Sequence, residues 1–184
     1  ASRMRLLLEV VAAVRQTVDP GFVVAVKLNA TDQLEGGFAE SEALEVVAAL
    51  DETDIDLIDI SGGTYFPGAK SASDSAGSGP YFLDFAAQAR QRTSKPLMAT
   101  GGFKTRQQTV DALVSGSVDL AGLARSFVLD ADLPNNWRSD GAVDPEFPRF
   151  SSPPVGGITA WYTMRLTQMA EDRETTEVPD LEAA

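Results

Sequence analysis

One stretch decides the fold: Phe22-Val23-Val24-Ala25-Val26-Lys27-Leu28-Asn29. It is apolar and rich in β-branched residues until polarity returns near its end. Such a run is typical of a strand that is covered on both faces, as in a parallel sheet. Three stretches of similar character follow, at residues 56–61, 95–100 and 119–124. We therefore expect four buried strands.

Helical patterns lie between these strands. Apolar residues at three- and four-residue steps predict an amphipathic helix over residues 3–17. Ser41 is a plausible N-cap for a second helix that extends to Leu50, a third covers residues 81–92, and Thr105 caps a fourth that runs to Ser115. Strands that alternate with helices in this way indicate an α/β fold with a parallel sheet of about four β/α units.

The last part of the chain has a different pattern. Residues 131–157 hold five prolines and little periodicity, which indicates an ordered surface excursion, and a last helix begins near Ile158 and leads to a frayed tail. We expect this organisation: a β/α part over residues 1–130, the proline-rich excursion over 131–157, and the helix with its tail over 158–184.

Composition excludes several kinds of chemistry. The net charge is −12, so the chain should repel nucleic acids and anionic membrane surfaces. With 0 Cys and 0 His it can build no thiolate nucleophile, no Cys/His zinc site and no imidazole base. Its apolar runs are too short to span a bilayer, so we expect a cytoplasmic protein. The helical pattern at the very start suggests a piece of something longer.

Ligands of parallel α/β folds bind beyond the carboxyl ends of the strands. At the third end, Gly101 and Gly102 precede a helix, so their amides could approach an anion closely. Arg125 follows the fourth strand and could hold two phosphate oxygens. Together these residues predict a phosphate site. The alternatives are an ordinary tight turn for the glycines and a surface ion pair for Arg125.

Lys27 is the least expected residue in the first strand. A cation there must be desolvated unless an anion or an electron-rich acceptor faces it, and a ligand could be that acceptor. Alternatively, Lys27 extends to water or pairs with Asp59 on the neighbouring strand. The loop from Ser61 to Tyr65 is most simply a plain loop. Scattered carboxylates do not define a geometry, and we predict no metal site.

The strand ends taken in order resemble one known family. The motifs are Val26-Lys27-Leu28-Asn29, Asp59-Ile60-Ser61-Gly62-Gly63-Thr64-Tyr65, Pro96 to Arg106 around Thr100-Gly101-Gly102-Phe103, and Gly122-Leu123-Ala124-Arg125. They are similar to the Old Yellow Enzyme family of NADH:flavin oxidoreductases over nearly the whole chain.

The resemblance implies the second half of an FMN-binding (β/α)8 TIM barrel. By that resemblance, Lys27 would face the pyrimidine edge of the flavin. The amides around Gly101, Gly102 and Phe103, with Ala124 and Arg125, would hold the 5′-phosphate, and Tyr65 would border the substrate mouth. Many relatives have Gly where this sequence has Ala124, a mild departure because backbone amides bind the phosphate.

The resemblance also implies a missing part. A family member is about twice as long, and its first half supplies the donors that anchor the substrate, so the catalytic residues of this chain stay unknown. Four strands cannot close a barrel, so this chain alone would leave strand edges and an apolar inner face exposed. We expect the isolated chain to be poorly stable or to associate, with an N-terminal half-barrel or an oligomer partner completing it.

Three functions remain open. The first is the C-terminal part of an FMN-dependent NAD(P)H oxidoreductase that passes hydride to an activated alkene or a similar small acceptor. The second is a noncatalytic half-barrel that binds a phosphorylated ligand at most weakly. The third is another phosphate-binding barrel, an isomerase or aldolase, in which Lys27 would form a Schiff base.

Overall fold

The computed structural model describes residues 3–62, 79–139, 141–148 and 157–171. The chain divides into two compact units, Ala1–Gly122 and Leu123–Ala184. The first unit holds the sheet, and the second holds helices only among its described residues. We describe each unit by itself.

A parallel sheet of four strands forms the first unit. The strands are β1 (Ala25–Asn29), β2 (Leu57–Ser61), β3 (Leu97–Thr100) and β4 (Leu120–Gly122), hydrogen-bonded in the order β1-β2-β3-β4. All pairs are parallel. The four predicted strands and the α/β class are therefore confirmed. The register places Lys27 opposite Asp59 and Thr100 opposite Gly122.

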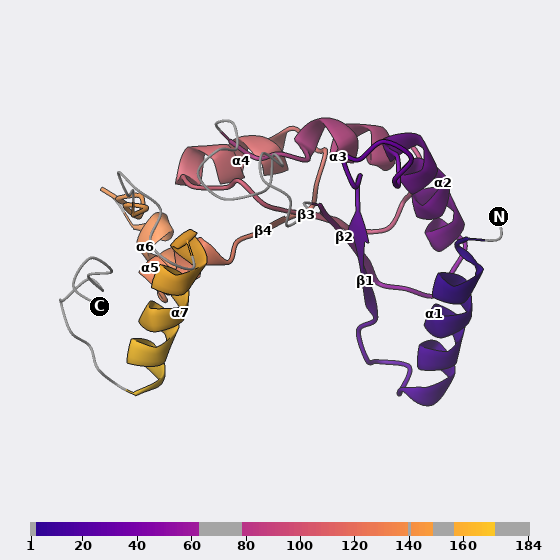
Figure 1. Ribbon diagram of the computed structural model, residues 1–184, viewed down its shortest axis with the longest axis horizontal. Helices are drawn as coiled ribbons and strands as arrows, with labels where there is room; N and C mark the ends of the chain where they lie inside the picture. Colours follow the sequence, from indigo (N-terminus) through magenta and orange to yellow (C-terminus); the bar gives the residue numbers. More distant parts are fainter. Residues whose placement is uncertain (1–2, 63–78, 140, 149–156, 172–184) are drawn as a thin grey trace. The chain divides into compact units, whose positions relative to one another are not determined.

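Helices α1 (Arg5–Thr17), α2 (Glu40–Asp51), α3 (Leu83–Arg90) and α4 (Arg106–Val114) line one side of this sheet (Figure 1). Their apolar faces and the outer faces of the strands form the core, whose least exposed large side chains in this unit are Val47, Leu50, Ile58, Ile60 and Leu97. Burial of such aliphatic side chains is the main source of stability in a domain of this kind.

Two helix caps were predicted, and one is confirmed. The Thr105 hydroxyl accepts a hydrogen bond from the Gln108 amide and begins α4. The prediction of Ser41 as the cap of α2 is wrong, because the cap is Ala39 and the helix already begins at Glu40. There the Glu42 carboxylate accepts the amide of Ala39, so a side chain inside the first turn does the capping.

Within this chain β1 is covered on one face only, although its apolar run is typical of a strand that is covered on both faces. Val26 and Leu28 are buried against the helix layer, whereas Ala25, Lys27 and Asn29 alternate with them and are exposed. The reason is the architecture: among residues 3–62 and 79–122, the helices lie on one side of the sheet only (Figure 1). A continuously apolar strand sequence fits a face that other strands would cover in a closed barrel.

Two arginines fasten the N-terminal ends of the strands. Arg15 of α1 donates to the Phe22 carbonyl, 2.5 Å, and pairs with the Asp56 carboxylate, Nη1 to Oδ2 3.3 Å. The same Asp56 oxygen accepts the amide of Val24 at 2.8 Å. One guanidinium and one carboxylate therefore hold the entries to β1 and β2 together.

The same arrangement recurs at β3 and β4. Arg90 of α3 donates to the Lys95 carbonyl, 3.1 Å, and pairs with the Asp119 carboxylate, Nη2 to Oδ2 2.6 Å. That oxygen accepts the amide of Leu97 at 2.8 Å. We call each set an arginine bracket: Arg15 with Asp56, and Arg90 with Asp119. Each one fixes two neighbouring strands at the end opposite the predicted ligand site.

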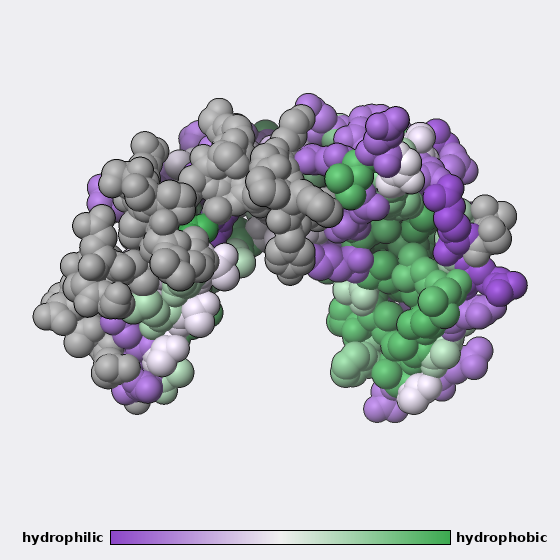
Figure 2. All heavy atoms as spheres, viewed as in Figure 1, coloured by the Kyte–Doolittle hydropathy of each residue, from purple (hydrophilic) through white to green (hydrophobic). Residues whose placement is uncertain are grey.

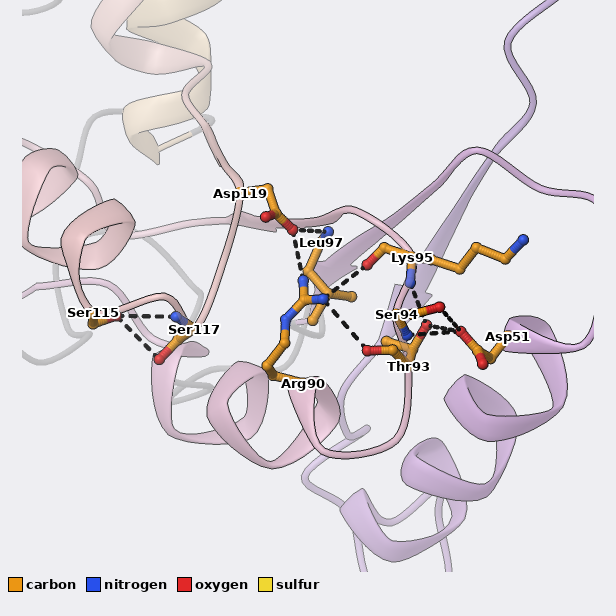
Figure 3. A network of polar contacts seen from close by, with 9 residues as sticks. All are labelled: Asp51, Arg90, Thr93, Ser94, Lys95, Leu97, Ser115, Ser117 and Asp119. Carbon is orange, nitrogen blue, oxygen red and sulfur yellow. Dashed lines mark hydrogen bonds and ion pairs between the residues drawn. The ribbon is translucent and has the colours of Figure 1, made fainter.

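Asp51 joins the end of α2 to the loop that leads into β3 (Figure 3). This last residue of α2 accepts a hydrogen bond from the Thr93 hydroxyl at 2.6 Å and one from the Ser94 amide at 2.8 Å. Both donors lie in the loop that leads into β3. The hydroxyl of Thr93 and then the amide of Ser94 lower the pKa of Asp51 from its ordinary value of 3.8, because they stabilise the carboxylate form.

The second unit contains three helices among its described residues. They are α5 (Arg125–Leu129), α6 (Leu133–Arg138) and α7 (Gly157–Ala170). Ile158, Trp161 and Tyr162 form a buried cluster against Val128 and Leu129 of α5. In neither unit do the described residues form a helix that is long and apolar enough to cross a bilayer.

The proline-rich stretch contains helix α6, which the sequence pattern did not predict. Leu133 and Trp137 of this helix are buried. Pro134 lies in its first turn, where the missing amide proton costs no hydrogen bond, so proline starts this helix instead of breaking it.

The Asp51 link predicts an acid-dependent loss of stability. Because the folded pKa lies below the unfolded value of about 3.9, the link stabilises the fold above that pH. Its contribution is lost as pH falls through the folded pKa. We expect Asp51→Asn to flatten the decline in unfolding free energy between about pH 5 and pH 2.5, measured by urea unfolding. Glu45→Gln, exposed on the same helix, is the control and should keep the wild-type decline.

Candidate functional site

Lys27 and Asp59 form an ion pair across β1 and β2. The Lys27 Nζ lies 2.6 Å from Asp59 Oδ2. The Asp59 side chain is only 11% exposed, whereas that of Lys27 is 55% exposed. The neighbouring-strand pairing that the sequence left open is therefore present. The pair also leaves the ammonium open to further acceptors, because an ammonium has three donors.

Thr100 extends this polar chain to β3. Its hydroxyl donates to the other carboxylate oxygen, Asp59 Oδ1, at 2.7 Å. Gly122 of β4 makes room for it, because a Cβ at position 122 would overlap the Thr100 hydroxyl oxygen. All four strands thus contribute to this polar chain. Three of them supply its side chains, and β4 contributes Gly122, whose lack of a side chain makes room for the Thr100 hydroxyl.

The turn after β3 requires both of its glycines. Gly101 has φ +124° and Gly102 has φ +83°, values that side chains rarely adopt. A Cβ on Gly102 would overlap the Gly79 carbonyl and lie 2.9 Å from Pro80 Cα. The Tyr81 amide donates to the Gly101 carbonyl at 3.3 Å. The segment 79–82 therefore packs directly on this turn, so the glycines also satisfy the tight-turn alternative.

The N-terminus of α4 is closed by its own side chains. The Gln108 amide oxygen accepts the Lys104 amide at 2.9 Å and the Thr105 amide at 3.3 Å. Phe103, between the glycines and this cap, is 5% exposed. Two of the amides at the start of α4 therefore already have partners within the chain. At the end of β3, the glycine turn is then the part of the backbone to consider as an anion site.

Ala124 and Arg125 belong to the second unit. Arg125 is the first residue of α5, and its guanidinium carbon lies 5.9 Å from the centre of the Tyr162 ring. This is a cation–π contact, which neither of the readings of Arg125 from the sequence foresaw. The predicted phosphate site combines Gly101, Gly102 and Phe103 of one unit with Ala124 and Arg125 of the other, and it stays a prediction. Tyr65 lies outside the described residues.

Sequence reasoning placed Thr100 and Gly122 in the strand-end motifs but gave neither of them a role, and it considered Asp59 only as a possible partner. The one signal in the sequence was position: Thr100 and Gly122 are the last residues of β3 and β4, and Asp59 lies two residues before the end of β2. Two of the chain's scattered carboxylates have structural partners: Asp56 belongs to an arginine bracket, and Asp32 accepts the Phe38 amide at 3.0 Å.

Four consecutive parallel β/α units, with polar side chains gathered at the carboxyl ends of the strands, define the class as part of a (β/α)8 barrel. The model of the NADH:flavin oxidoreductase / NADH oxidase family matches residues 1–141. The chain belongs to this family, which confirms the resemblance to the Old Yellow Enzymes.

Two curated relatives illustrate the match. The NADH-dependent flavin oxidoreductase iliE of Neonectria sp. (strain DH2) is 35% identical over 146 residues, which cover 73% of this chain and 19% of that protein. The NADH-dependent flavin oxidoreductase nadA of Aspergillus parasiticus is 36% identical over 135 residues, 68% of this chain and 29% of that protein. The chain therefore spans less than a third of the length of either relative.

Solved structures support the same fold. Morphinone reductase aligns with a TM-score of 0.59 at 25% identity, over 78% of this chain and 36% of its own. The old yellow enzyme homologue from Zymomonas mobilis aligns with a TM-score of 0.58 at 20% identity, over 85% of this chain and 42% of its own. The predicted partial barrel is thus confirmed as the fold class.

The glycine turn gives a graded prediction for stability. Gly102→Ala adds both a strained φ and an overlap with Gly79, so we expect a loss of about 3 kcal/mol in unfolding free energy. Gly116→Ala, with φ +72° and open space around it, should lose about 1 kcal/mol. Gly21→Ala, in open space without such a φ, should be nearly neutral. Equal losses for Gly102 and Gly116, measured by urea unfolding, would contradict the packing of segment 79–82 on the turn.

Proposed function

We propose that this chain supplies the pyrimidine and phosphate contacts for FMN in an NAD(P)H-dependent flavin oxidoreductase of the ene-reductase type. The observation that carries the proposal is the Lys27 ammonium. It is fixed by Asp59 at the carboxyl end of the sheet while more than half of its side chain stays exposed. A donor that is held on one side and open on the other is suited to a ligand.

The residues present fit the pyrimidine edge of a flavin. When bound, FMN would carry the hydride from NAD(P)H to the small-molecule acceptor, an activated alkene or a similar compound. Lys27 would donate to the electron-rich edge of the ring, and its positive charge would stabilise negative charge there. Asp59 and Thr100 would keep that ammonium in place.

For the 5′-phosphate we propose the glycine turn together with the start of α5. The positive φ values of Gly101 and Gly102 turn the backbone at the end of β3, where backbone amides could face an anion. Phe103 would contribute its amide from the same turn, and Ala124 would do so from the second unit. Arg125 would add a planar, permanently charged fork for two phosphate oxygens.

Binding of FMN to the purified chain tests this proposal. We expect quenching of FMN fluorescence on titration, and we expect Arg125→Ala to weaken the affinity by about tenfold or more, because hydrogen bonds to charged groups are among the stronger ones. Arg5→Ala removes the same charge from an exposed side chain of α1 and should leave the affinity unchanged.

The opposite result would favour a different function. If the chain does not bind FMN, or if Arg125→Ala and Arg5→Ala behave alike, the noncatalytic half-barrel becomes the better interpretation. An aldolase or isomerase with Lys27 as a Schiff-base residue receives less support, because a nucleophilic lysine attacks as a free amine, whereas Lys27 is paired with a carboxylate.

We also propose a partner: the remaining strands of the barrel, supplied by an N-terminal half-barrel. Its contact surface on this chain is an apolar stripe on α1, formed by Leu6, Val10 and Val14 at intervals of four residues, with Phe22 and Val23 beside it. Figure 2 shows hydrophobic side chains gathered over α1 and the neighbouring strand β1. The apolar stripe of helix α1 and the unpaired edge of strand β1 together form a surface that a neighbouring parallel β/α unit would cover.

The exposed stripe predicts that the isolated chain associates. In sedimentation velocity we expect a weight-average mass that rises with concentration, because apolar surface of this extent favours association. Val10→Glu should shift the distribution toward the monomer, whereas Glu9→Lys, a charge change at the adjacent exposed position, should not. A wild-type chain that stays monomeric and melts at high temperature would contradict the proposed contact surface.

A further inference from the structure

Both oxygens of the Asp59 carboxylate are engaged by side chains of other strands. Lys27 Nζ lies 2.6 Å from Oδ2, and the Thr100 hydroxyl donates to Oδ1 at 2.7 Å. The Asp59 residue is 8% exposed, so these partners replace most of the water that an ionised carboxylate needs. A carboxylate held at both oxygens cannot rotate freely, and neither can the ammonium that it holds.

Thr100 in turn depends on β4. A Cβ at Gly122 would overlap the Thr100 hydroxyl oxygen and lie 2.8 Å from Thr100 Cβ, so only glycine allows this rotamer opposite Thr100 in the register. The geometry of the Lys27 ammonium is thus determined by residues on three other strands. A side chain with four rotatable bonds would otherwise lose much more conformational entropy on meeting a ligand.

We infer that Asp59 is a positioning residue for Lys27, and that Thr100, admitted by Gly122, holds Asp59 for this purpose. This inference rests on the proposed function, in which Lys27 meets the pyrimidine edge of FMN. Asp59 lies behind the ammonium and affects the cofactor only through it. Removing Asp59 therefore costs binding as long as Lys27 is present, and costs nothing more once Lys27 is gone.

The first experiment needs no flavin. In the full chain labelled with ¹⁵N and ¹³C, we expect the Lys27 ammonium to give a slowly exchanging NMR signal with a hydrogen-bond scalar coupling to the Asp59 carboxylate carbon. Asp59→Asn should abolish both. Thr100→Val should weaken them while both charges remain, and Thr100→Ser, which keeps the hydroxyl, should restore them. A Lys27 signal that is unchanged in Asp59→Asn would overturn the inference.

The second experiment is a double-mutant cycle on FMN affinity. We expect Asp59→Asn to weaken binding about tenfold, Lys27→Met by at least as much, and the double variant no more than Lys27→Met alone. Thr100→Val should weaken binding about threefold, with recovery in Thr100→Ser. Asp84→Asn, an exposed carboxylate in the first turn of α3, is the control. Circular dichroism and thermal melts show which variants are folded.

The two experiments separate the two possible failures. Additive losses in the cycle would mean that Asp59 acts on the fold and not through Lys27, which overturns the inference while FMN binding stands. If the wild-type chain binds no FMN, the proposed function fails for this chain, and the NMR comparison of wild type, Asp59→Asn and the Thr100 variants alone decides whether Asp59 positions Lys27.

Discussion

The parallel sheet depends on the arginine brackets at its N-terminal edge. A parallel strand pair cannot be closed by a tight hairpin, so each strand enters the sheet from a helix, and its register must be set at that entry. In both brackets, one guanidinium binds the carbonyls of its own helix-to-strand loop and the carboxylate ahead of the next strand. That carboxylate then accepts the amide at the entry to the neighbouring strand. Together the two brackets fix the entries to all four strands by hydrogen bonds to charged groups.

The opposite edge uses the same kinds of groups for a different result. Lys27, Asp59 and Thr100 are linked as tightly as the brackets, yet the lysine keeps more than half of its side chain exposed. At the N-terminal ends of the strands, the charged groups of the brackets bind partners within the chain. At the carboxyl edge, one donor group is held in position and left available, which is the arrangement a ligand site requires. In the proposed function, this exposed ammonium is the group that would meet the flavin.

The sequence pattern predicted the elements well, because burial of strand and helix faces leaves a clear periodicity. It predicted all four strands, and helix α4 with its Thr105 cap. The apolar run of β1 did not by itself show that one face is exposed, because such a run looks the same whether its cover belongs to this chain or to another. The exposed inner face followed from the resemblance to half of a barrel. Helix α6 was not predicted, because proline usually indicates the end of a helix. Pro134 is allowed in the first turn of α6, but this placement depends on where the helix begins, which the sequence pattern did not show.

The candidate site was predictable in position but not in composition. Lys27 stood out as a cation within an apolar run, and its possible partner Asp59 was one of several carboxylates nearby. The roles of Thr100 and Gly122 were not predicted, because they arise from register: one hydroxyl reaches a carboxylate on the neighbouring strand, and one glycine makes room for that hydroxyl. Pairing across strands is a property of the sheet and not of any single segment.

The brackets also recur in a way that the amino-acid pattern hides. Arg15 with Asp56 and Arg90 with Asp119 perform identical tasks in successive pairs of strands. Because this anchoring lies wholly at one edge, the loops at the opposite edge can diverge during evolution without disturbing the alignment of the backbone beneath them. The scaffold thereby separates the residues that stabilise the sheet from the loops that determine its chemistry. A new substrate preference could arise by exchange of a loop while the arginine brackets stay unchanged.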